Sequence, residues 1–279
     1  MSDFVGFARA HGLIIRDLDA TGRLARVPTV DHPRRKDGAY RWDGVTGFVY
    51  RWDEEAKPIW FDAPDRPQDT AQRALRERMA QQHRAEMEQG WARAAQEAQR
   101  LLVASGLGHH AYLDSKGLRD AQGFVDMHGA LIVPMRSLSG ELRGAQVIRE
   151  TSDGFDKRML PGMRAKGAVF RIGPPGAVLT VLCEGYATGL SISEAIKQMR
   201  LNWAVLVCFS AGNLEYVAPL VRGAKGVFAD HDKSGRGEQA AKTTGLPYVM
   251  SDVVGEDAND LHQRAGLIAL CAKLQRLRW

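Results

Sequence analysis

The hydrophobic pattern is clearest over residues 178–250, where short runs that are apolar throughout alternate with segments of helical composition. The strand-like runs are AVLTVLCEG, WAVLVCFS, GVFAD and PYVMS, and the helical segments between them are YATGLSISEAIKQM, NLEYVAPLVR and GRGEQAAKTTG. Strands without polar positions are buried on both faces, which is typical of a parallel sheet covered by helices. We therefore predict an α/β domain with a parallel sheet and flanking helices over residues 178–279.

Two further patterns precede this domain. Residues 105–177 contain short apolar runs separated by turns, including ALIVPMRSLSGELRGAQVIRE, two strands joined by a Ser-Gly turn, so we predict a mixed α+β subdomain. Residues 68–104 contain no proline and one glycine, which predicts a long helix with Gly90 as its candidate interruption. Because apolar positions are sparse in this helix, we expect it to link domains and not to fill a core.

Residues 1–67 mix glycine-containing turns with short runs of aromatic and β-branched residues, a pattern that predicts a small antiparallel β module. Within it, residues 23–62 interleave arginines and lysines with tryptophans and tyrosines. Bases stack on aromatic rings while cations meet phosphates, so this combination favours contact with single-stranded nucleic acid. The candidate contacts are Arg41, Trp42 and Trp52. The alternative is that the aromatic side chains form the core of the sheet.

The distribution of charge indicates a second candidate surface. The chain of 279 residues has a formal net charge of +5 and 25% charged residues, which is ordinary for a globular protein. Residues 130–177, however, contain eight lysines and arginines against four acidic residues. A local excess of positive charge is typical of a phosphate-binding surface, and the alternative is a solvated basic face.

The cysteines exclude several classes of protein. Cys183, Cys208 and Cys271 lie far apart and form no C-x-x-C pair, which argues against a disulfide framework and a zinc ribbon. We therefore expect no zinc and a cytoplasmic location. The N-terminus has no signal-peptide pattern and the longest apolar runs are about six residues, so we expect no membrane partner. No Gly-Lys dipeptide occurs in the sequence, which argues against a P-loop ATPase.

Acidic residues stand where the predicted parallel strands end. Glu184 ends the first strand, Asp230 ends the third with Asp232 just beyond it, and EDANDL, residues 256–261, follows the fourth. Two carboxylates this close raise each other's pKa unless a cation lies between them. In parallel sheets ligands bind at the carboxyl ends of strands, and Mg²⁺ prefers oxygen ligands. We therefore predict a cation site at this edge of the sheet, suited to phosphoryl transfer.

Two groups of motifs resemble a known family. CEGYATGLS, VFADHDKSGRGEQAA and GEDANDLHQRAG resemble the three motifs of a Toprim domain, the fold shared by bacterial-type primases, type IA and type II topoisomerases and some nucleases. AYLDSKGL, LIVPMRSLSGELRGAQVI and DKRMLPGMRAKGAVFRIG resemble the basic subdomain that precedes Toprim in bacterial-type primases, especially those of phages and plasmids. The resemblance covers about residues 108–266. We divide the chain into an N-terminal module (1–67), a linking helix (68–104), a basic subdomain (105–177) and a Toprim domain (178–279).

The resemblance implies roles for individual residues. The catalytic and metal-binding acids would be Glu184, Asp230 and Asp232, with Asp257 and Asp260 as further metal ligands, and the nucleotide and template would contact Lys116, Arg136, Lys157 and Lys166. The implied activity is that of a DNA primase, which makes short RNA primers from NTPs on single-stranded DNA with Mg²⁺ or Mn²⁺. The implied partners are single-stranded DNA, NTPs and a replicative helicase acting in trans.

Two features depart from the family pattern. Some primases carry an aspartate where this chain has Thr188, which leaves one metal ligand missing or replaced by water. Bacterial-type primases usually begin with a cysteine-rich zinc module, whereas residues 1–182 contain no cysteine. One alternative is a Toprim nuclease, which needs the metal site but not the basic subdomain. Another is a non-catalytic replication accessory protein that binds single-stranded DNA. A topoisomerase is disfavoured because no nucleophilic-tyrosine domain is recognisable.

Overall fold

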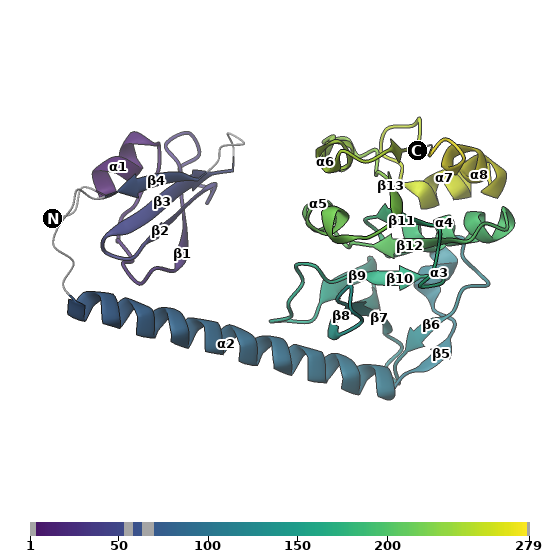
Figure 1. Cartoon of the computed structure of the whole chain (residues 1–279), viewed down its shortest axis with the longest axis horizontal. Helices are drawn as coiled ribbons and strands as arrows, with labels where there is room; N and C mark the ends of the chain where they lie inside the picture. Colours follow the sequence, from purple (N-terminus) through teal and green to yellow (C-terminus); the bar gives the residue numbers. More distant parts are fainter. Residues whose placement is uncertain (1–3, 53–57, 63–69, 278–279) are drawn as a thin grey trace. The chain divides into compact units, whose positions relative to one another are not determined.

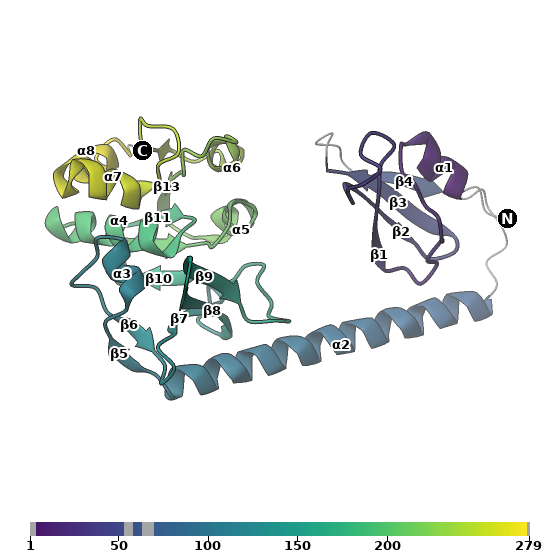
Figure 2. The same cartoon turned by 180° about the vertical axis from the view of Figure 1, so that it is seen from behind.

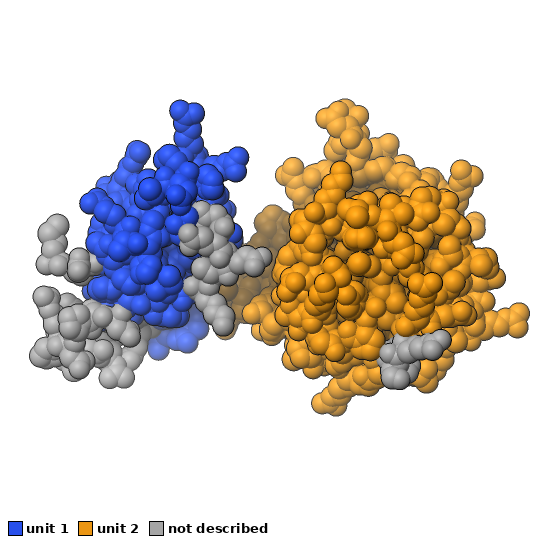
Figure 3. Space-filling model, turned by 90° about the horizontal axis from the view of Figure 1, so that it is seen from above, with its two compact units in different colours: residues 1–84 blue, residues 85–279 orange. Residues whose placement is uncertain are grey.

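The computed structural model describes residues 4–52, 58–62 and 70–277 of the chain. The chain divides into two compact units, residues 1–84 and residues 85–279 (Figure 3). Each unit has a β-sheet core of its own.

The N-terminal unit is an antiparallel meander in which each strand pairs with the next along the sequence (Figure 1). A short helix packs through Phe4 on the sheet face that carries Tyr40, Trp42 and Val49. The predicted β module is confirmed, whereas the sequence pattern does not indicate the helix. The elements are α1 (Phe4–Ala10), β1 (Leu24–Val27), β2 (Gly38–Trp42), β3 (Thr46–Arg51) and β4 (Ile59–Asp62).

Gly47 in β3 allows α1 to approach the sheet closely. A Cβ atom at this position would overlap the carbonyl oxygen of Arg41 and would lie 2.9 Å from the ring of Phe4. In the space that glycine leaves, the rings of Phe4 and Trp42 stack with their centroids 4.4 Å apart, and Phe61 meets both rings edge-on. Buried aromatic rings contribute large apolar areas, so this cluster stabilises a unit with few other core residues.

Helix α2 (Thr70–Val103) runs for 34 residues and is not interrupted at Gly90. A glycine in a helix costs about 1 kcal/mol relative to alanine, which is too little to break a helix of this length. At its C-terminal end, Ala98, Leu101 and Leu102 join a hydrophobic cluster of the second unit. Within the described ranges, no helix is long and apolar enough to cross a membrane.

The second unit contains two sheets. The first is an antiparallel meander in the order β5-β6-β7-β8-β9, and its central hairpin is the pair of strands predicted around the Ser-Gly turn. Helix α3 lies between its first two strands in the sequence. The elements are β5 (Gly106–Gly108), α3 (Ala111–Ser115), β6 (Gly123–Val125), β7 (Leu131–Arg136), β8 (Leu142–Thr151) and β9 (Gly154–Met159).

The second sheet of this unit has the order β10-β12-β11-β13-β14, and all of its pairings are parallel except that of β10 with β12. The prediction of a mainly parallel sheet is therefore confirmed. Strand β10, which lies within the residues that we assigned to the basic subdomain, pairs with this sheet. The strands are β10 (Phe170–Ile172), β11 (Leu179–Cys183), β12 (Trp203–Val207), β13 (Ala224–Phe228) and β14 (Tyr248–Val249).

Helices cover both faces of the parallel sheet (Figures 1 and 2). On one face, alternate strand residues such as Val181 and Val205 join a core cluster with α4, α7 and α8. On the other face, Leu182 and Leu206 join a cluster with α5, η1 and α6. This double burial explains why these strands are mostly apolar, with few exceptions such as Thr180 in β11 and Lys225 in β13. The helices are α4 (Tyr186–Gln198), α5 (Ala211–Val217), η1 (Ala218–Leu220), α6 (Arg236–Thr244), α7 (Ala258–Ala265) and α8 (Leu267–Leu274).

The strand order creates a switch point between β11 and β13. The chain leaves β11 into α4 on one face of the sheet and leaves β13 into α6 on the other face. Connections that depart in opposite directions from neighbouring parallel strands leave a crevice at the carboxyl ends of those strands, where ligands bind in such sheets.

Candidate active site

Glu184 and Asp230 flank this switch point. Glu184 follows β11 directly, and Asp230 lies two residues beyond the end of β13. Because β11 and β13 are parallel neighbours, the two residues lie at the same edge of the sheet, as their positions in the sequence predict. We call the acids gathered here, Glu184, Asp230, Asp232, Asp257 and Asp260, the acidic edge.

Asp230 is the most strongly perturbed acid of this group. Burial raises its pKa to about 8, and the negative charges of Asp257, Glu184, Asp232 and Asp260 add to the shift. In the described structure its Oδ1 atom is buried without a hydrogen-bond partner. A buried carboxylate among other carboxylates is unfavourable unless a proton or a cation neutralises it.

The backbone of Asp230 is also closely packed. A Cβ atom at Gly237 would overlap the carbonyl oxygen of Asp230, so only glycine lets the first turn of α6 lie against this residue. Gly237, in the sequence GRGEQAA that begins at Gly235, thus allows α6 to start close to the end of β13.

Glu184 shares the buried character of this edge. Burial raises its pKa, whereas the backbone N–H of Ala211 lowers it, and smaller charge effects from Asp232 and Arg236 oppose each other. The backbone N–H of Phe209 donates to the carbonyl oxygen of Glu184 at 2.8 Å, which links this residue to the end of β12. A carboxyl group with a raised pKa is suited to accept and release protons.

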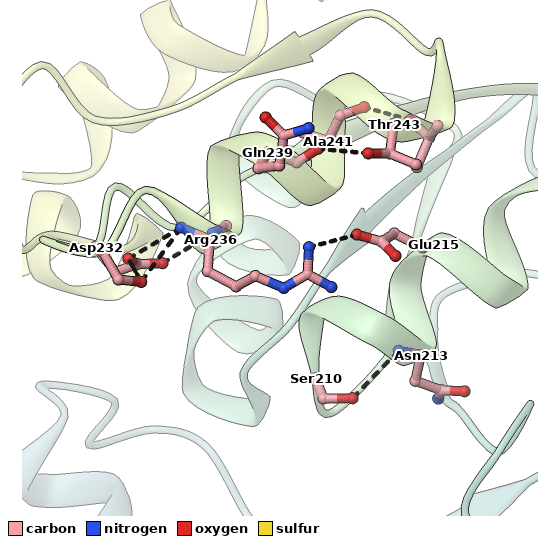
Figure 4. Close-up of polar contacts among 11 residues, drawn as sticks. Ser210, Asn213, Glu215, Asp232, Arg236, Gln239, Ala241 and Thr243 are labelled. Carbon is pink, nitrogen blue, oxygen red and sulfur yellow. Dashed lines mark hydrogen bonds and ion pairs between the residues drawn. The ribbon is translucent and has the colours of Figure 1, made fainter. Parts of the chain in front are cut away.

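Asp232 has the opposite electrostatic environment. Its carboxylate accepts hydrogen bonds from the hydroxyl of Ser234 and from the backbone N–H groups of Gly237 and Arg236, at the start of α6 (Figure 4). These bonds, led by that of Ser234, lower its pKa to about 2. The Arg236 side chain turns away and bonds to Glu215 of α5 at 2.7 Å (Figure 4). Asp232 is therefore an ionised carboxylate that the backbone holds in place.

Asp257 and Asp260 begin helix α7. Asp257 accepts hydrogen bonds from the backbone N–H groups of Asn259 and Asp260, and the Asp260 carboxylate accepts one from the backbone N–H of Asp257. This reciprocal arrangement is a capping box, here with aspartate at both positions. These two acids, which we predicted as further metal ligands, therefore also have a structural role.

Thr188 contacts the acidic edge directly. Its hydroxyl donates to Oδ2 of Asp257 at 2.6 Å, and the residue is buried. The threonine that departs from the family pattern thus supplies a hydrogen-bond donor to one acid of the site. The sequence alone gave no sign of this contact because 69 positions separate the two residues.

The antiparallel sheet carries a basic residue, Lys157, whose charge interacts with that of Asp257. Lys157 of β9 donates to the Tyr112 hydroxyl at 3.0 Å and lies 4.6 Å from the centre of its ring. Burial lowers the pKa of Lys157, and the charge of Asp257 acts in the opposite direction. Burial raises the pKa of Tyr112 to about 12, with smaller effects from Lys116 and Asp257. Tyr112, which sequence reasoning did not single out, therefore belongs to the part of the basic subdomain that interacts with the acidic edge.

Two hydrogen bonds from Asn259 connect α7 to the basic subdomain and to α4. The Asn259 side chain donates to the carbonyl oxygen of Lys116 at 2.8 Å and to the hydroxyl of Ser191 at 3.0 Å. Asn259 is fully buried, so these bonds satisfy a polar group that water does not reach. The loop after α3 is in this way attached to α7, the helix that Asp257 caps.

The other predicted basic residues lie apart from this junction. Arg136 donates to the carbonyl oxygen of Gly140 within its own hairpin, and Lys166 lies 4.4 Å from the ring centre of Tyr216. A pocket of about 290 Å³ opens beside Lys166, lined also by Met159, Cys208, Ser210 and Asn213. Ser210 caps α5 by accepting from the backbone N–H of Asn213 (Figure 4).

The acidic edge offers oxygen ligands but no preassembled cage. Across the residues that the structure describes, no three His, Cys, Asp or Glu side chains are grouped closely enough to hold a metal ion. The buried Oδ1 of Asp230 and the all-oxygen donor set nevertheless fit a hard divalent cation such as Mg²⁺. The predicted set of five ligands remains a prediction.

Of the three residues predicted to contact single-stranded nucleic acid, Arg41 and Trp52 are exposed and Trp42 is buried. Trp42 is only 1% exposed and stacks on Phe4, so its ring is not accessible to a base, contrary to our expectation. It points inward because its position in β2 alternates with that of Arg41, which is exposed. Trp52 is 44% exposed.

Comparison with known proteins gives one family. Residues 179–267 match the model of a family described as a Toprim domain. This confirms the resemblance in the three acidic motifs, and it does not extend to the basic subdomain. A search of curated proteins found no match.

One solved structure of low similarity comes from bacteriophage T7. It contains the lagging-strand DNA polymerase interacting with primase domains of two gp4 subunits bound to an RNA/DNA hybrid and dTTP. The chain matched there is 15% identical, with a TM-score of 0.38, over 63% of the present chain and 89% of the other. A TM-score of this size does not establish a common fold.

Proposed function

We propose that this chain, whose residues 179–267 form a Toprim domain, is a DNA primase. It would make short RNA primers from NTPs on single-stranded DNA, with Mg²⁺ or Mn²⁺ as its cofactor. In this reaction the 3′-hydroxyl of one nucleotide attacks the α-phosphate of the next, and pyrophosphate leaves. The cytoplasm, a phage or plasmid origin and a helicase partner remain part of the same proposal.

One observation carries the proposal. Lys157 and Tyr112 of the basic subdomain lie within electrostatic reach of Asp257, whose charge also acts on the buried Asp230. A nuclease needs only the acids. A cation such as Lys157 within electrostatic reach of them favours a substrate with a triphosphate, because its negative charge must be balanced close to the metal.

We assign each acid a different role in the reaction, according to its environment. Asp230 and Asp232 would hold the cation, which supplies positive charge to the triphosphate. Glu184, whose pKa burial raises, would accept the proton of the attacking 3′-hydroxyl. Lys157, oriented by the Tyr112 hydroxyl, would bind a phosphate oxygen of the incoming nucleotide.

A primer-synthesis assay with labelled NTPs on single-stranded templates, with and without Mg²⁺ or Mn²⁺, tests the proposal. Asp230→Asn should lower synthesis by at least about a hundredfold, because it removes a charge where water is largely excluded. Asp120→Asn, an exposed acid outside the acidic edge, is the matched control and should leave synthesis unchanged. Lys157→Ala should raise the KM for NTPs.

Two results would reject this function. If Asp230→Asn made primers at the wild-type rate, the acidic edge would not be the catalytic centre. If the wild-type chain cleaved DNA in an Asp230-dependent manner and made no primers, the site would be that of a nuclease.

A further inference from the structure

The N-terminal sheet has a second face, opposite the one that α1 covers. Strand register places Leu24, Arg41, Phe48 and Trp60 in one row across all four strands, and Arg26, Ala39 and Tyr50 in the next row. The residues that join the core, Tyr40, Trp42, Val49 and Phe61, alternate with these and point the other way. We call Leu24, Arg26, Arg41, Phe48, Tyr50, Trp52 and Trp60 the aromatic face.

The rings of this face are arranged in pairs. Phe48 and Trp60 pack edge to face with their centroids 5.2 Å apart, and Tyr50 and Trp52 do so at 5.0 Å. Trp60 remains 63% exposed and Trp52 remains 44% exposed, beside Leu24 at 57%. Contiguous apolar surface of this kind on a small unit indicates a binding site.

Two arginines lie among the rings in defined orientations. The Arg26 guanidinium lies 4.4 Å from the centre of the Trp52 ring and donates to the carbonyl oxygen of Lys36 at 2.7 Å. Arg41 is held by a bond from Nε to the carbonyl oxygen of Gly22 at 2.8 Å. Both cations therefore stay on the face, and neither extends freely into solvent.

We propose that the aromatic face binds single-stranded DNA. Unpaired bases would stack on Trp60 and Trp52, and backbone phosphates would meet Arg26 and Arg41. Duplex DNA is a poor ligand for such a face because its bases are already stacked on each other. The choice of a DNA strand over a protein as the occupant rests on the proposed function, which requires a single-stranded template.

The composition of the aromatic face determines how much of the affinity comes from stacking and how much from charge. Stacking contributes most of the affinity, because only two arginines belong to the face while four aromatic rings do. Each phosphate neutralised on a single strand changes the slope of log K against log salt by about 0.7. Replacing both arginines should therefore flatten that slope by about 1.4. Replacing a tryptophan should weaken binding without changing the slope.

Binding of a labelled oligo-dT to the full chain, measured by fluorescence anisotropy with EDTA at several salt concentrations, tests this inference. Trp60→Leu and Trp52→Leu should each weaken binding about tenfold, whereas Trp60→Phe, which keeps a ring, should stay within about threefold. Ile268→Ala, at an exposed apolar residue of the second unit, is the control and should bind as the wild type does. Arg26→Gln with Arg41→Gln should flatten the salt slope.

A second measurement locates the strand directly. Oligonucleotides that carry 5-iododeoxyuridine should crosslink under ultraviolet light to peptides containing Trp52 or Trp60. The inference is overturned if both leucine variants bind like the wild type and no crosslink reaches the peptides containing Trp52 or Trp60. It is also overturned if duplex DNA binds as tightly as the single strand, or if the face proves to bind a second copy of the chain in place of DNA.

The same experiments separate this inference from the proposed function. If the wild-type chain makes no primers but the leucine variants lose affinity for oligo-dT, the aromatic face stands and the primase proposal fails. If primers are made, the leucine variants bind normally and no crosslink reaches the peptides containing Trp52 or Trp60, the primase proposal stands and the inference about this face fails.

Discussion

The acidic edge and the aromatic face show two different ways in which a sheet can present a candidate binding site. Helices cover both faces of the parallel sheet, so only the ends of its strands are open, and its polar residues gather there. In the N-terminal sheet the core cluster lies on one face, and the other face carries the exposed side chains of Leu24 and Trp60. The first is built from half-buried carboxylates, and the second carries exposed tryptophan rings.

This difference decides where a substitution acts. On the acidic edge, one residue affects both the fold and the chemistry, because Asp232, Asp257 and Asp260 accept backbone hydrogen bonds at the starts of α6 and α7. On the N-terminal sheet, alternation separates the two roles, since neighbouring residues such as Arg41 and Trp42 point to opposite faces. Stability and binding should therefore be separable in one region and coupled in the other.

The largest expected effect tests this separation in the N-terminal unit. Trp42→Ala should lower the free energy of unfolding of that unit by about 3–5 kcal/mol, because it removes a buried ring that stacks on Phe4. Trp60→Ala should lower it by less than about 1 kcal/mol, because its ring is mostly exposed. Urea denaturation followed by circular dichroism measures both changes. Equal losses in the two variants would mean that the two faces of the sheet are not distinct.

The next effect concerns the buried charge of Asp230. Its pKa is raised to about 8 in the folded protein, so the folded state binds a proton more tightly than the unfolded state does. Without metal, the free energy of unfolding should therefore fall as pH rises from about 4 towards 8, by up to about 1.4 kcal/mol per pH unit. Asp230→Asn carries no such charge and should become more stable than the wild type as the pH rises.

Thermal unfolding of both proteins in EDTA between pH 5 and pH 8 measures this difference. Addition of Mg²⁺ should stabilise the wild type and have little effect on Asp230→Asn, because a cation replaces the proton at that carboxylate. A difference in stability between the two proteins that does not change with pH would show that Asp230 is ionised throughout this range, and would contradict the prediction.

The sequence predicted the parallel sheet and its acidic edge because both follow from local order. Apolar strands must be buried, and residues that directly follow them, such as Glu184, must lie at the strand ends. The sequence could not show that Trp42 is buried while Arg41 is exposed. Which of two neighbouring strand residues points into the core depends on which face of the sheet α1 covers. Tyr112 and Thr188 were not assigned as site residues because their partners lie far away in the chain, at Lys157 and Asp257.

The smallest of these effects concerns Thr188 and shows how closely fold and chemistry are coupled at the acidic edge. Thr188→Val keeps the shape of the side chain but removes the donor to Oδ2 of Asp257. Because Asp257 is half-buried, losing this hydrogen bond should cost about 1 kcal/mol, so the variant should unfold at a lower denaturant concentration. Thr188→Ser retains the hydroxyl and should recover most of that loss. If Thr188→Val were as stable as the wild type while Thr188→Ser were not, the methyl group, and not the hydrogen bond to Asp257, would account for the threonine.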